Sequence, residues 1–154
     1  MISLTKRTDY ALMAMAHLAG HGADHPVSAR DIAGRYTLPA ELLAKILQKL
    51  ARSGLLNSSP GPTGGYTLAR PAEEITVGAV LQAVEGYPGL TRCLRADHSD
   101  CDQAKRCTVR RPLERINARV LTMLDDIPVS ELARDLTTSG TAGSGAQALR
   151  MIAT

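Results

Sequence analysis

The 154-residue sequence has no phenylalanine and no tryptophan, and it has only four tyrosines. A core in this chain must therefore be built from Leu, Ile, Val, Met and Ala side chains. The scarcity of aromatic rings also argues against a protein that binds single-stranded nucleic acid, because such proteins stack bases on aromatic side chains. At this length we expect one core that needs no disulfide cross-links.

Long apolar runs are also missing. No run approaches the roughly 20 apolar residues that a membrane-spanning helix requires, so we expect no membrane partner. Polar and basic residues rather than an apolar stretch follow Met1, which predicts no signal peptide and a cytoplasmic protein. The sequence lacks a nucleophile elbow, a phosphate-binding loop and a cysteine paired with histidine and asparagine, so we do not expect an enzyme.

Cysteine is absent except from one segment, "CLRADHSDCDQAKRC", which contains Cys93, Cys101 and Cys107. An odd number of cysteines favours a reducing compartment over a disulfide framework. Closely spaced thiolates suit zinc or an iron–sulfur cluster, but a metal normally takes four ligands. Three interpretations stay open here: a cluster, a zinc ion completed by His98 or an aspartate, and redox-sensing thiols without a metal.

The helical patterns that are present predict a helix-turn-helix. Apolar residues from Leu4 to Leu18 recur at helical spacing, and glycines follow them. Ser28 is expected to cap a short second helix that ends near Tyr36. After the turn at Pro39, "AELLAKILQKLARSG" predicts a longer amphipathic third helix.

A hairpin follows the third helix directly and predicts a wing. Two short extended runs, Leu55 to Ser59 and Tyr66 to Ala69, flank a turn rich in Gly and Pro. Thr76 is the expected N-cap of the next helix, "ITVGAVLQAVEG". The predicted fold class is therefore mainly α with a small β wing: a winged helix-turn-helix domain.

The C-terminal part predicts dimerisation. "TVRRPLERINARVLTMLDDI" has an apolar stripe that a compact winged domain would not cover, so we expect a homodimer formed by this helix. The predicted domains are a winged helix-turn-helix domain at 1–86, a cysteine-containing loop at 87–107, a dimerisation helix with a short terminal helix at 108–136, and a disordered tail at 137–154.

Double-stranded DNA is the expected partner. The basic excess lies in residues 1–70, which carry eight Lys or Arg against four Asp or Glu, although a solvated basic face is the alternative. The first residues of the second helix of such a pair reach base edges, and the preceding helix and the wing contact the backbone. The predicted DNA-binding residues are Ser28, Arg30, Pro39, Ala40, Glu41, Lys45, Lys49, Thr63, Gly64, Gly65 and Tyr66.

The order of "LTKRTDYAL", "LPAELLAKILQKLARSGLL", "GPTGGYTLARP", "ITVGAVLQAVEG" and three cysteines resembles the winged-helix repressors of the IscR, NsrR and RirA group, the Rrf2 family. The resemblance covers about residues 1–135. It implies a dimeric bacterial transcription regulator that represses iron–sulfur assembly or iron-homeostasis genes. Its affinity for a pseudo-palindromic operator would depend on a 4Fe-4S or 2Fe-2S cluster bound to Cys93, Cys101 and Cys107.

The cysteine spacing is similar to that of the RirA and Suf-operon branches. The histidine that IscR-like members supply after the last cysteine is replaced here by Arg110. In the NsrR branch, an aspartate in an "LTxxTD" stretch of the other subunit is the fourth ligand, and the resemblance assigns this role to Asp9. In the wing, Pro60 stands where the family has an arginine, which implies weaker DNA contact. A zinc-bound or cluster-free DNA-binding protein that senses oxidants through its thiols is the alternative.

Overall fold

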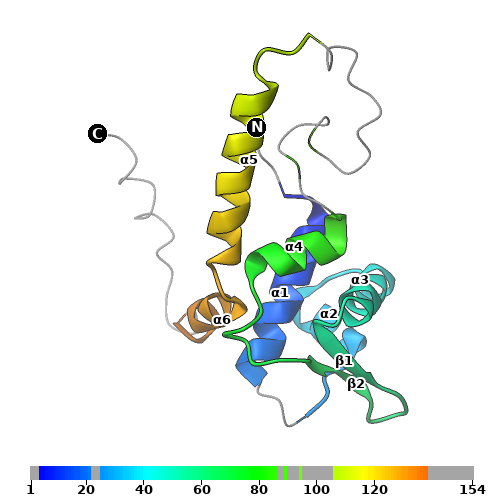
Figure 1. Cartoon of the computed structure of the whole chain (residues 1–154). Helices are drawn as coiled ribbons and strands as arrows, with labels where there is room; N and C mark the ends of the chain where they lie inside the picture. Colours follow the sequence, from blue (N-terminus) through cyan, green and yellow to red (C-terminus); the bar gives the residue numbers. More distant parts are fainter. Residues whose placement is uncertain (1–3, 22–24, 87–88, 90–93, 95–105, 139–154) are drawn as a thin grey trace.

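A computed structural model describes residues 4–21, 25–86, 89, 94 and 106–138 (Figure 1). The described part is mainly α-helical with one two-stranded antiparallel sheet, as predicted. None of its helices is long and apolar enough to span a membrane. The elements, in order, are α1 (Lys6–His21), α2 (Ala29–Tyr36), α3 (Ala40–Arg52), β1 (Leu56–Ser59), β2 (Gly65–Leu68), α4 (Val77–Glu85), α5 (Arg110–Asp125) and α6 (Val129–Thr138).

The predicted helix boundaries at α2 and α3 are confirmed. The Ser28 hydroxyl accepts a hydrogen bond from the backbone N–H of Asp31 at 3.1 Å, which is the expected N-cap of α2. The helix ends at Tyr36, and Thr37 has φ 54 in the left-handed region. Helix α3 begins after Pro39 and is followed by Gly54 at φ +76, where glycine carries no steric penalty.

The hairpin is joined to the start of α2. Strands β1 and β2 pair antiparallel, with Leu56 opposite Leu68. The backbones of Val27 and Tyr66 exchange two hydrogen bonds, of 3.1 and 2.9 Å. A Cβ added to Gly65 would lie 2.5 Å from the Val27 carbonyl, so only glycine allows this approach. The wing therefore has a fixed position relative to α2.

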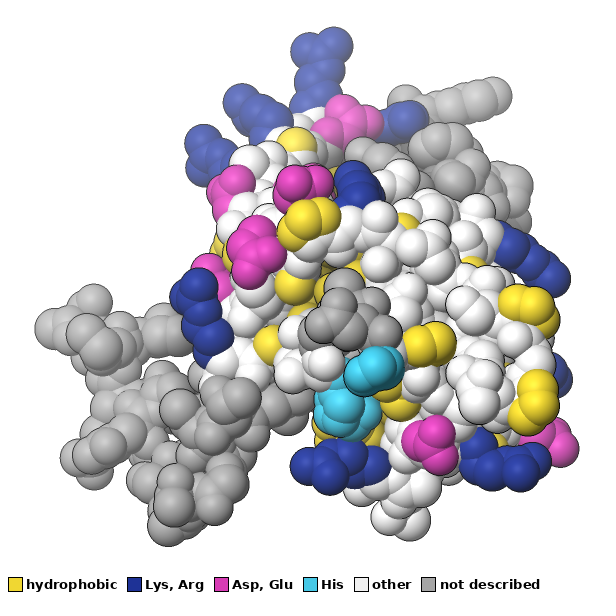
Figure 2. All heavy atoms as spheres, turned by 90° about the horizontal axis from the view of Figure 1, so that it is seen from below, with side chains coloured by type: hydrophobic (Ala, Val, Ile, Leu, Met, Phe, Trp, Pro, Cys, Tyr) yellow, Lys and Arg dark blue, Asp and Glu magenta, His cyan; other side chains and the backbone are white. Residues whose placement is uncertain are grey.

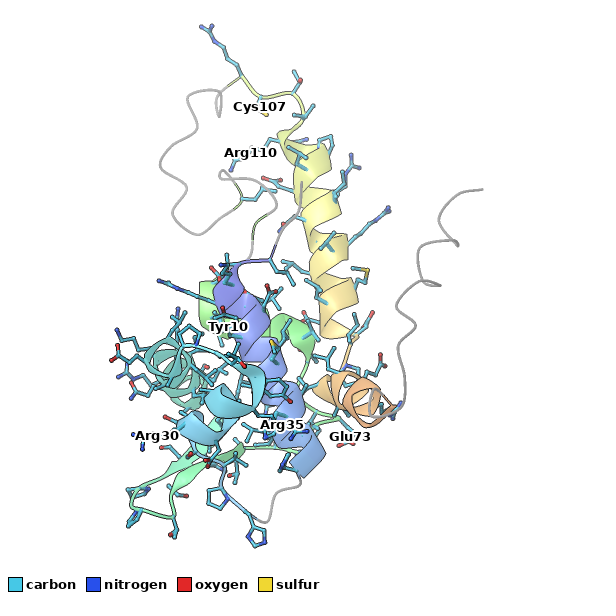
Figure 3. The ribbon with its side chains drawn as sticks, turned by 180° about the vertical axis from the view of Figure 1, so that it is seen from behind. Tyr10, Arg30, Arg35, Glu73, Cys107 and Arg110 are labelled. Atoms are coloured by element: carbon cyan, nitrogen blue, oxygen red, sulfur yellow. The ribbon has the colours of Figure 1, made fainter. Side chains whose placement is uncertain are left out.

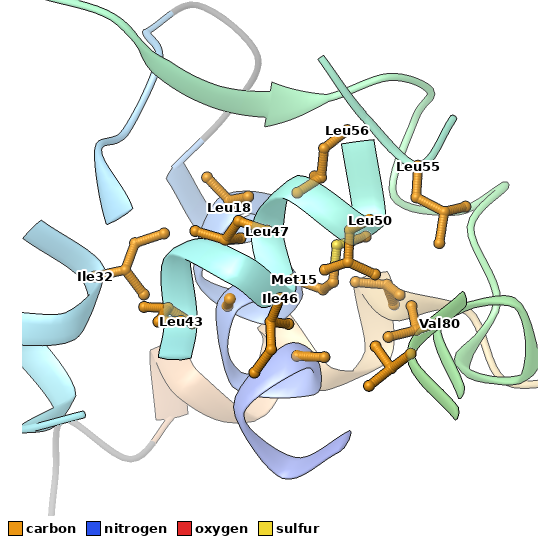
Figure 4. Close-up of a cluster of buried hydrophobic side chains, with 14 of the residues drawn as sticks. Met15, Leu18, Ile32, Leu43, Ile46, Leu47, Leu50, Leu55, Leu56 and Val80 are labelled. Atoms are coloured by element: carbon orange, nitrogen blue, oxygen red, sulfur yellow. The ribbon is translucent and has the colours of Figure 1, made fainter. Parts of the chain in front are cut away.

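The core lies where α1, α3 and α4 meet beneath the hairpin (Figure 4). Burial of each Leu or Ile side chain is worth about 1.5–3 kcal/mol in transfer free energy. As predicted, the fully buried large side chains are almost all aliphatic; they are Met15, Ile32, Leu43, Leu47, Leu50, Ile75, Val80 and Val129, with the polar Thr8. Leu4, expected on the apolar face of the first helix, instead precedes α1 and is 50% exposed.

The last two helices differ in how they contact this core. Helix α5 extends away from the winged domain, whereas α6 returns and packs against α1 (Figure 1). The backbone N–H of Val129 donates to the Ile75 carbonyl at 2.8 Å, and Thr76 and Pro128 form a β-bridge. Helix α6 extends to Thr138, two residues beyond the predicted boundary at 136. The rest of the predicted tail lies outside the described residues.

Candidate nucleic-acid interface and metal-ligand residues

The N-terminal half of α3 presents its polar side to solvent. Pro39, Ala40, Glu41 and Lys45 are all exposed. The opposite side of α3 is buried in the core through Leu43, Ile46, Leu47 and Leu50. Such a helix, held by one face and exposed on the other, has the geometry required to enter a major groove.

The preceding helix presents an exposed cation, Arg30, beside the hairpin. Arg30 is exposed near the start of α2, close to the wing (Figure 3). Ser28 is less available than predicted, because its hydroxyl also donates to the Asp31 carboxylate at 2.6 Å while it caps α2. A phosphate at this helix end would have to compete with Asp31 for the Ser28 hydroxyl. Arg30 is therefore the better candidate for a backbone contact.

Most of the predicted wing residues shape the hairpin. A Cβ on Gly64 would lie 2.2 Å from the carbonyl oxygen of Ser59, so the turn requires glycine there. Gly65 makes the close approach to Val27 described above, and Tyr66 is half-buried against the core. Of the wing residues predicted to contact DNA, only Thr63 is fully exposed.

Lys49, predicted to contact DNA, makes a contact within the protein that the sequence did not predict. Its Nζ donates to the backbone carbonyl of Val84, in the last turn of α4, at 2.6 Å. Four residues advance a helix by slightly more than one turn, so Lys49 is rotated by about 40° from Lys45, and although it is exposed its ammonium reaches α4. The sequence pattern alone placed both lysines toward DNA. The structure instead engages the Lys49 ammonium in a contact between α3 and α4.

Charge on the surface is mixed. Seen from below, Lys and Arg side chains lie around the rim and alternate with Asp and Glu, without one continuous basic patch (Figure 2). Long-range steering by such a surface is weaker than steering by a single-sign patch. On this face, the mixed charges therefore favour local contacts over long-range attraction of a polyanion.

Of the predicted metal ligands, the structure describes Cys107 and Asp9. Cys107 is half-buried and lies just before α5, at the end of the molecule opposite the hairpin (Figure 3). Cys93, Cys101 and His98 lie outside the described residues. Within the described part of the chain, no three metal-ligating side chains gather. The start of α5 nevertheless fits an anionic cluster, because a helix N-terminus and the exposed Arg106 favour negative charge, whereas Arg110 is paired with Glu114 at 3.0 Å.

Asp9 is exposed in the first turn of α1, and the described residues give its carboxylate no hydrogen-bond partner. The helix start that carries it is firmly held. The hydroxyl of Thr8, which is 1% exposed, donates to the Glu85 carboxylate at 3.0 Å, and the Thr5 hydroxyl donates to the same oxygen. Thr5 also accepts from the backbone N–H of Thr8 at 3.3 Å. The two threonines of "LTKRTD" therefore anchor α1 to the end of α4.

Sequence reasoning missed Glu85 as the partner of these threonines. The residues lie 77 and 80 positions apart, and no local pattern connects them. Only the packing of α1 against α4 brings them together.

A buried histidine joins α1 to α2. His17 Nδ1 lies 3.1 Å from the Tyr36 hydroxyl, and the His17 and His21 rings are 4.0 Å apart between centroids. Burial, with smaller contributions from His21 and Arg35, lowers the pKa of His17. His17 was predicted to be an ordinary packing or surface residue, and it is a packing residue.

Comparisons with known proteins agree with this architecture. Residues 4–135 match the Rrf2 family, described as iron-dependent transcriptional regulators. The transcriptional regulator IscR of Vibrio atlanticus is 34% identical over 134 residues, which cover 87% of this chain and 76% of that protein. IscR of Photobacterium profundum is 34% identical over 132 residues, covering 86% and 76%.

Two solved structures are similar across nearly their whole length. IscR of T. potens superposes with a TM-score of 0.67 at 26% identity, covering 93% of this chain and 94% of that one. CymR, the global cysteine regulator of B. subtilis, superposes with a TM-score of 0.68 at 27% identity, covering 88% and 98%. The curated relatives are helix-turn-helix regulators rather than enzymes. With a recognition helix, a wing and a family match over most of its length, the chain belongs to the Rrf2 family of DNA-binding transcriptional regulators.

Proposed function

We propose that this regulator controls its operator affinity with an iron–sulfur cluster held by Cys93, Cys101 and Cys107, with Asp9 of a second copy as the fourth ligand. The cluster is 4Fe-4S or 2Fe-2S. The observation that carries the proposal is that the Asp9 carboxylate is exposed and has no hydrogen-bond partner among the described residues. The start of its helix is held in place by the hydrogen bonds of Thr5 and Thr8 to Glu85. Three thiolates and one oxygen ligand leave one iron weakly held, which supplies sensitivity to iron supply or redox state.

The proposed active form is a homodimer formed through α5. Val109, Ile116 and Met123 are 54%, 50% and 55% exposed, and Asn117 is the only residue of α5 that is buried. A two-fold axis beside α5 would cover these apolar side chains with their own copies. We propose that the same arrangement brings Asp9 of one copy toward Cys107 of the other.

The proposed partner is a pseudo-palindromic operator in double-stranded DNA, which places the protein in the cytoplasm. Two α3 helices related by two-fold symmetry would read half-sites whose centres lie about 34–36 Å apart. Pro39, Ala40, Glu41 and Lys45 would meet base edges, and Arg30 and Thr63 the phosphates. Glu41 can accept a hydrogen bond from the amino group of cytosine, so we expect cytosine in the half-site. The regulated genes are proposed to be those of iron–sulfur assembly or iron homeostasis, under repression.

Anaerobic purification tests the cofactor. We expect a brown protein with a broad visible absorption band, containing iron and sulfide, and an operator affinity that differs about 5- to 150-fold between cluster-bound and apo protein. Replacement of any of the three cysteines by serine should abolish the band and reproduce the apo affinity. Asp9→Ala should retain the band but lose it faster to chelator. A colourless protein that contains zinc, or no metal, would contradict the proposal.

A second candidate is a thiol sensor without a cluster. It is favoured by the similarity to Staphylococcus aureus CymR, whose structure was solved in an oxidized form (TM-score 0.63, 26% identity, covering 86% of this chain and 96% of that chain). In that case anaerobic protein would be colourless, and peroxide would change operator affinity in the wild type but not in a Cys107→Ser variant.

A further inference from the structure

The last turn of α4 receives hydrogen bonds from two other helices of the core, α1 and α3. Lys49 of α3 donates to the Val84 carbonyl at 2.6 Å. Thr8 of α1 donates to the Glu85 carboxylate at 3.0 Å, and Thr5 donates to the same oxygen. Two consecutive residues of α4 are thus bound to the recognition helix on one side and to α1 on the other.

The contact from α3 completes a helix end. The last carbonyls of a helix have no amide donor within the helix, and Gly86, at φ +81, donates to Gln82 rather than to Val84. Among the described residues, the Lys49 ammonium supplies a donor for Val84, and its positive charge lies at the negative end of the α4 dipole. Charge-assisted hydrogen bonds of this kind are the stronger ones.

The contact to α1 fixes the position of that acceptor. Glu85 lies at the C-terminal end of α4, where a carboxylate opposes the dipole of its own helix. The same carboxylate lies at the first turn of α1, where negative charge is favourable, and two hydroxyls donate to it. A shift of residues 84–86 would therefore disturb both helices together.

We propose that Lys49 is a positioning residue whose hydrogen bond to Val84 fixes the orientation of the recognition helix relative to α4. Residues 84–86 then connect the cysteine segment to the helix that binds DNA. The connection to the cysteine segment rests on the proposed function. Residues 87–107 connect Gly86 to the start of α5, so residues 84–86 are the point at which this segment joins the winged domain. The role of Lys49 in placing α3 stands without a cluster.

Salt dependence separates positioning from direct DNA contact. In apo protein, Lys49→Met should lower operator affinity roughly 5- to 10-fold and leave the slope of log affinity against log salt unchanged. Arg30→Met, which removes a proposed phosphate contact, should flatten that slope by about one unit. Gln82→Met, an exposed change on α4, is the control for affinity and should match wild type. Gln48 lies on the same face of α3 as Glu41 and Lys45, so Gln48→Met serves as a control only for the exchange measurement.

Hydrogen exchange reports the same contact in the absence of DNA. The Gly86 amide, which bonds to Gln82 in the same turn, should exchange faster in Lys49→Met than in Gln48→Met. Lys49→Arg should restore both the exchange rate and the affinity. If Lys49→Met flattens the salt slope as Arg30→Met does, or leaves both affinity and exchange at wild-type values, Lys49 does not position α3.

The connection to the cysteine segment needs the cluster-bound protein. Lys49→Met should keep the visible band of wild type while its ratio of cluster-bound to apo affinity falls toward one. Glu85→Gln should do the same, and the double variant should be no worse than either single one, because both act on one turn. A wild-type ratio retained in Lys49→Met would overturn the connection. A ratio of one in wild type would instead contradict the proposed function, with the apo salt slope still deciding the role of Lys49.

Discussion

The winged domain and α5 differ in where their apolar side chains are buried. Helices α1, α3 and α4 each bury a full apolar face within one chain, whereas the apolar side chains of α5 remain half-buried or exposed. Helix α5 nevertheless carries apolar residues at helical spacing, which is the pattern of a helix that packs on something. The core of the winged domain is thus closed within one chain, with α6 contributing Val129 to it, whereas the apolar stripe of α5 is left for a partner to cover.

The largest expected effect comes from a charge introduced into the apolar stripe of α5. Ile116→Glu should prevent dimerisation, because an unpaired charge buried at an interface costs about 3–5 kcal/mol, or roughly 100-fold or more in the dimer dissociation constant. Sedimentation velocity should show a monomer, and circular dichroism should show an unchanged helix content. Operator affinity should fall. Arg115→Glu, on the exposed charged side of α5, is the matched control and should remain dimeric. A dimeric Ile116→Glu protein would place the interface elsewhere.

A cavity in the winged domain should act in the opposite way. Leu47 is fully buried, so Leu47→Ala should lower the free energy of unfolding by about 2–5 kcal/mol at every protein concentration. Met123→Ala on α5 should lower the free energy of unfolding only at protein concentrations at which the dimer is populated. Urea unfolding at two protein concentrations distinguishes the two variants. The distinction fails if both show the same dependence on concentration.

Helix caps separate local stability from DNA contact. Ser28→Ala removes the N-cap of α2 and should cost about 1 kcal/mol of unfolding free energy, as should Thr76→Ala at α4. If Ser28 serves only as a cap, its removal leaves the salt slope of DNA binding unchanged. A flatter slope for Ser28→Ala, but not for Thr76→Ala, would restore Ser28 as a phosphate ligand.

The features that could be predicted from the sequence are local ones. The caps at Ser28 and Thr76, the glycine after α3 and the two strands depend on residues within a few positions of each other, and all of them are confirmed. The aliphatic core followed from helical spacing in the same way. Each of these signals is contained in one turn or one helix face, so a single sequence displays it.

The features that could not be predicted depend on packing between distant segments. Lys49 looked like a second DNA-facing lysine because its acceptor, the Val84 carbonyl, is a backbone group 35 positions away and leaves no mark in the sequence. The motif "LTKRTD" predicted a role for Asp9, but it did not predict that its two threonines bond to Glu85. The return of α6 to α1 was also unforeseen, since the helix pattern of "PVSELARDL" does not say which surface it covers. The metal ligand set remains a prediction, because two of its cysteines lie outside the described residues.

The smallest expected effect concerns pH and the joint between α1 and α2. Burial lowers the pKa of His17, so in the pH range below its unfolded value of 6.5 the folded state binds fewer protons than the unfolded state. Stability should therefore be fully present above about pH 7 and fall as pH drops below 6.5. His17→Gln, which keeps a polar group near the Tyr36 hydroxyl, should be less stable at pH 7.5 but lose less between pH 7.5 and 5.5 than wild type. Denaturant unfolding at the two pH values measures the difference. Equal losses in both proteins would show that His17 is not the titrating group, and that the winged domain responds to pH through groups outside this joint.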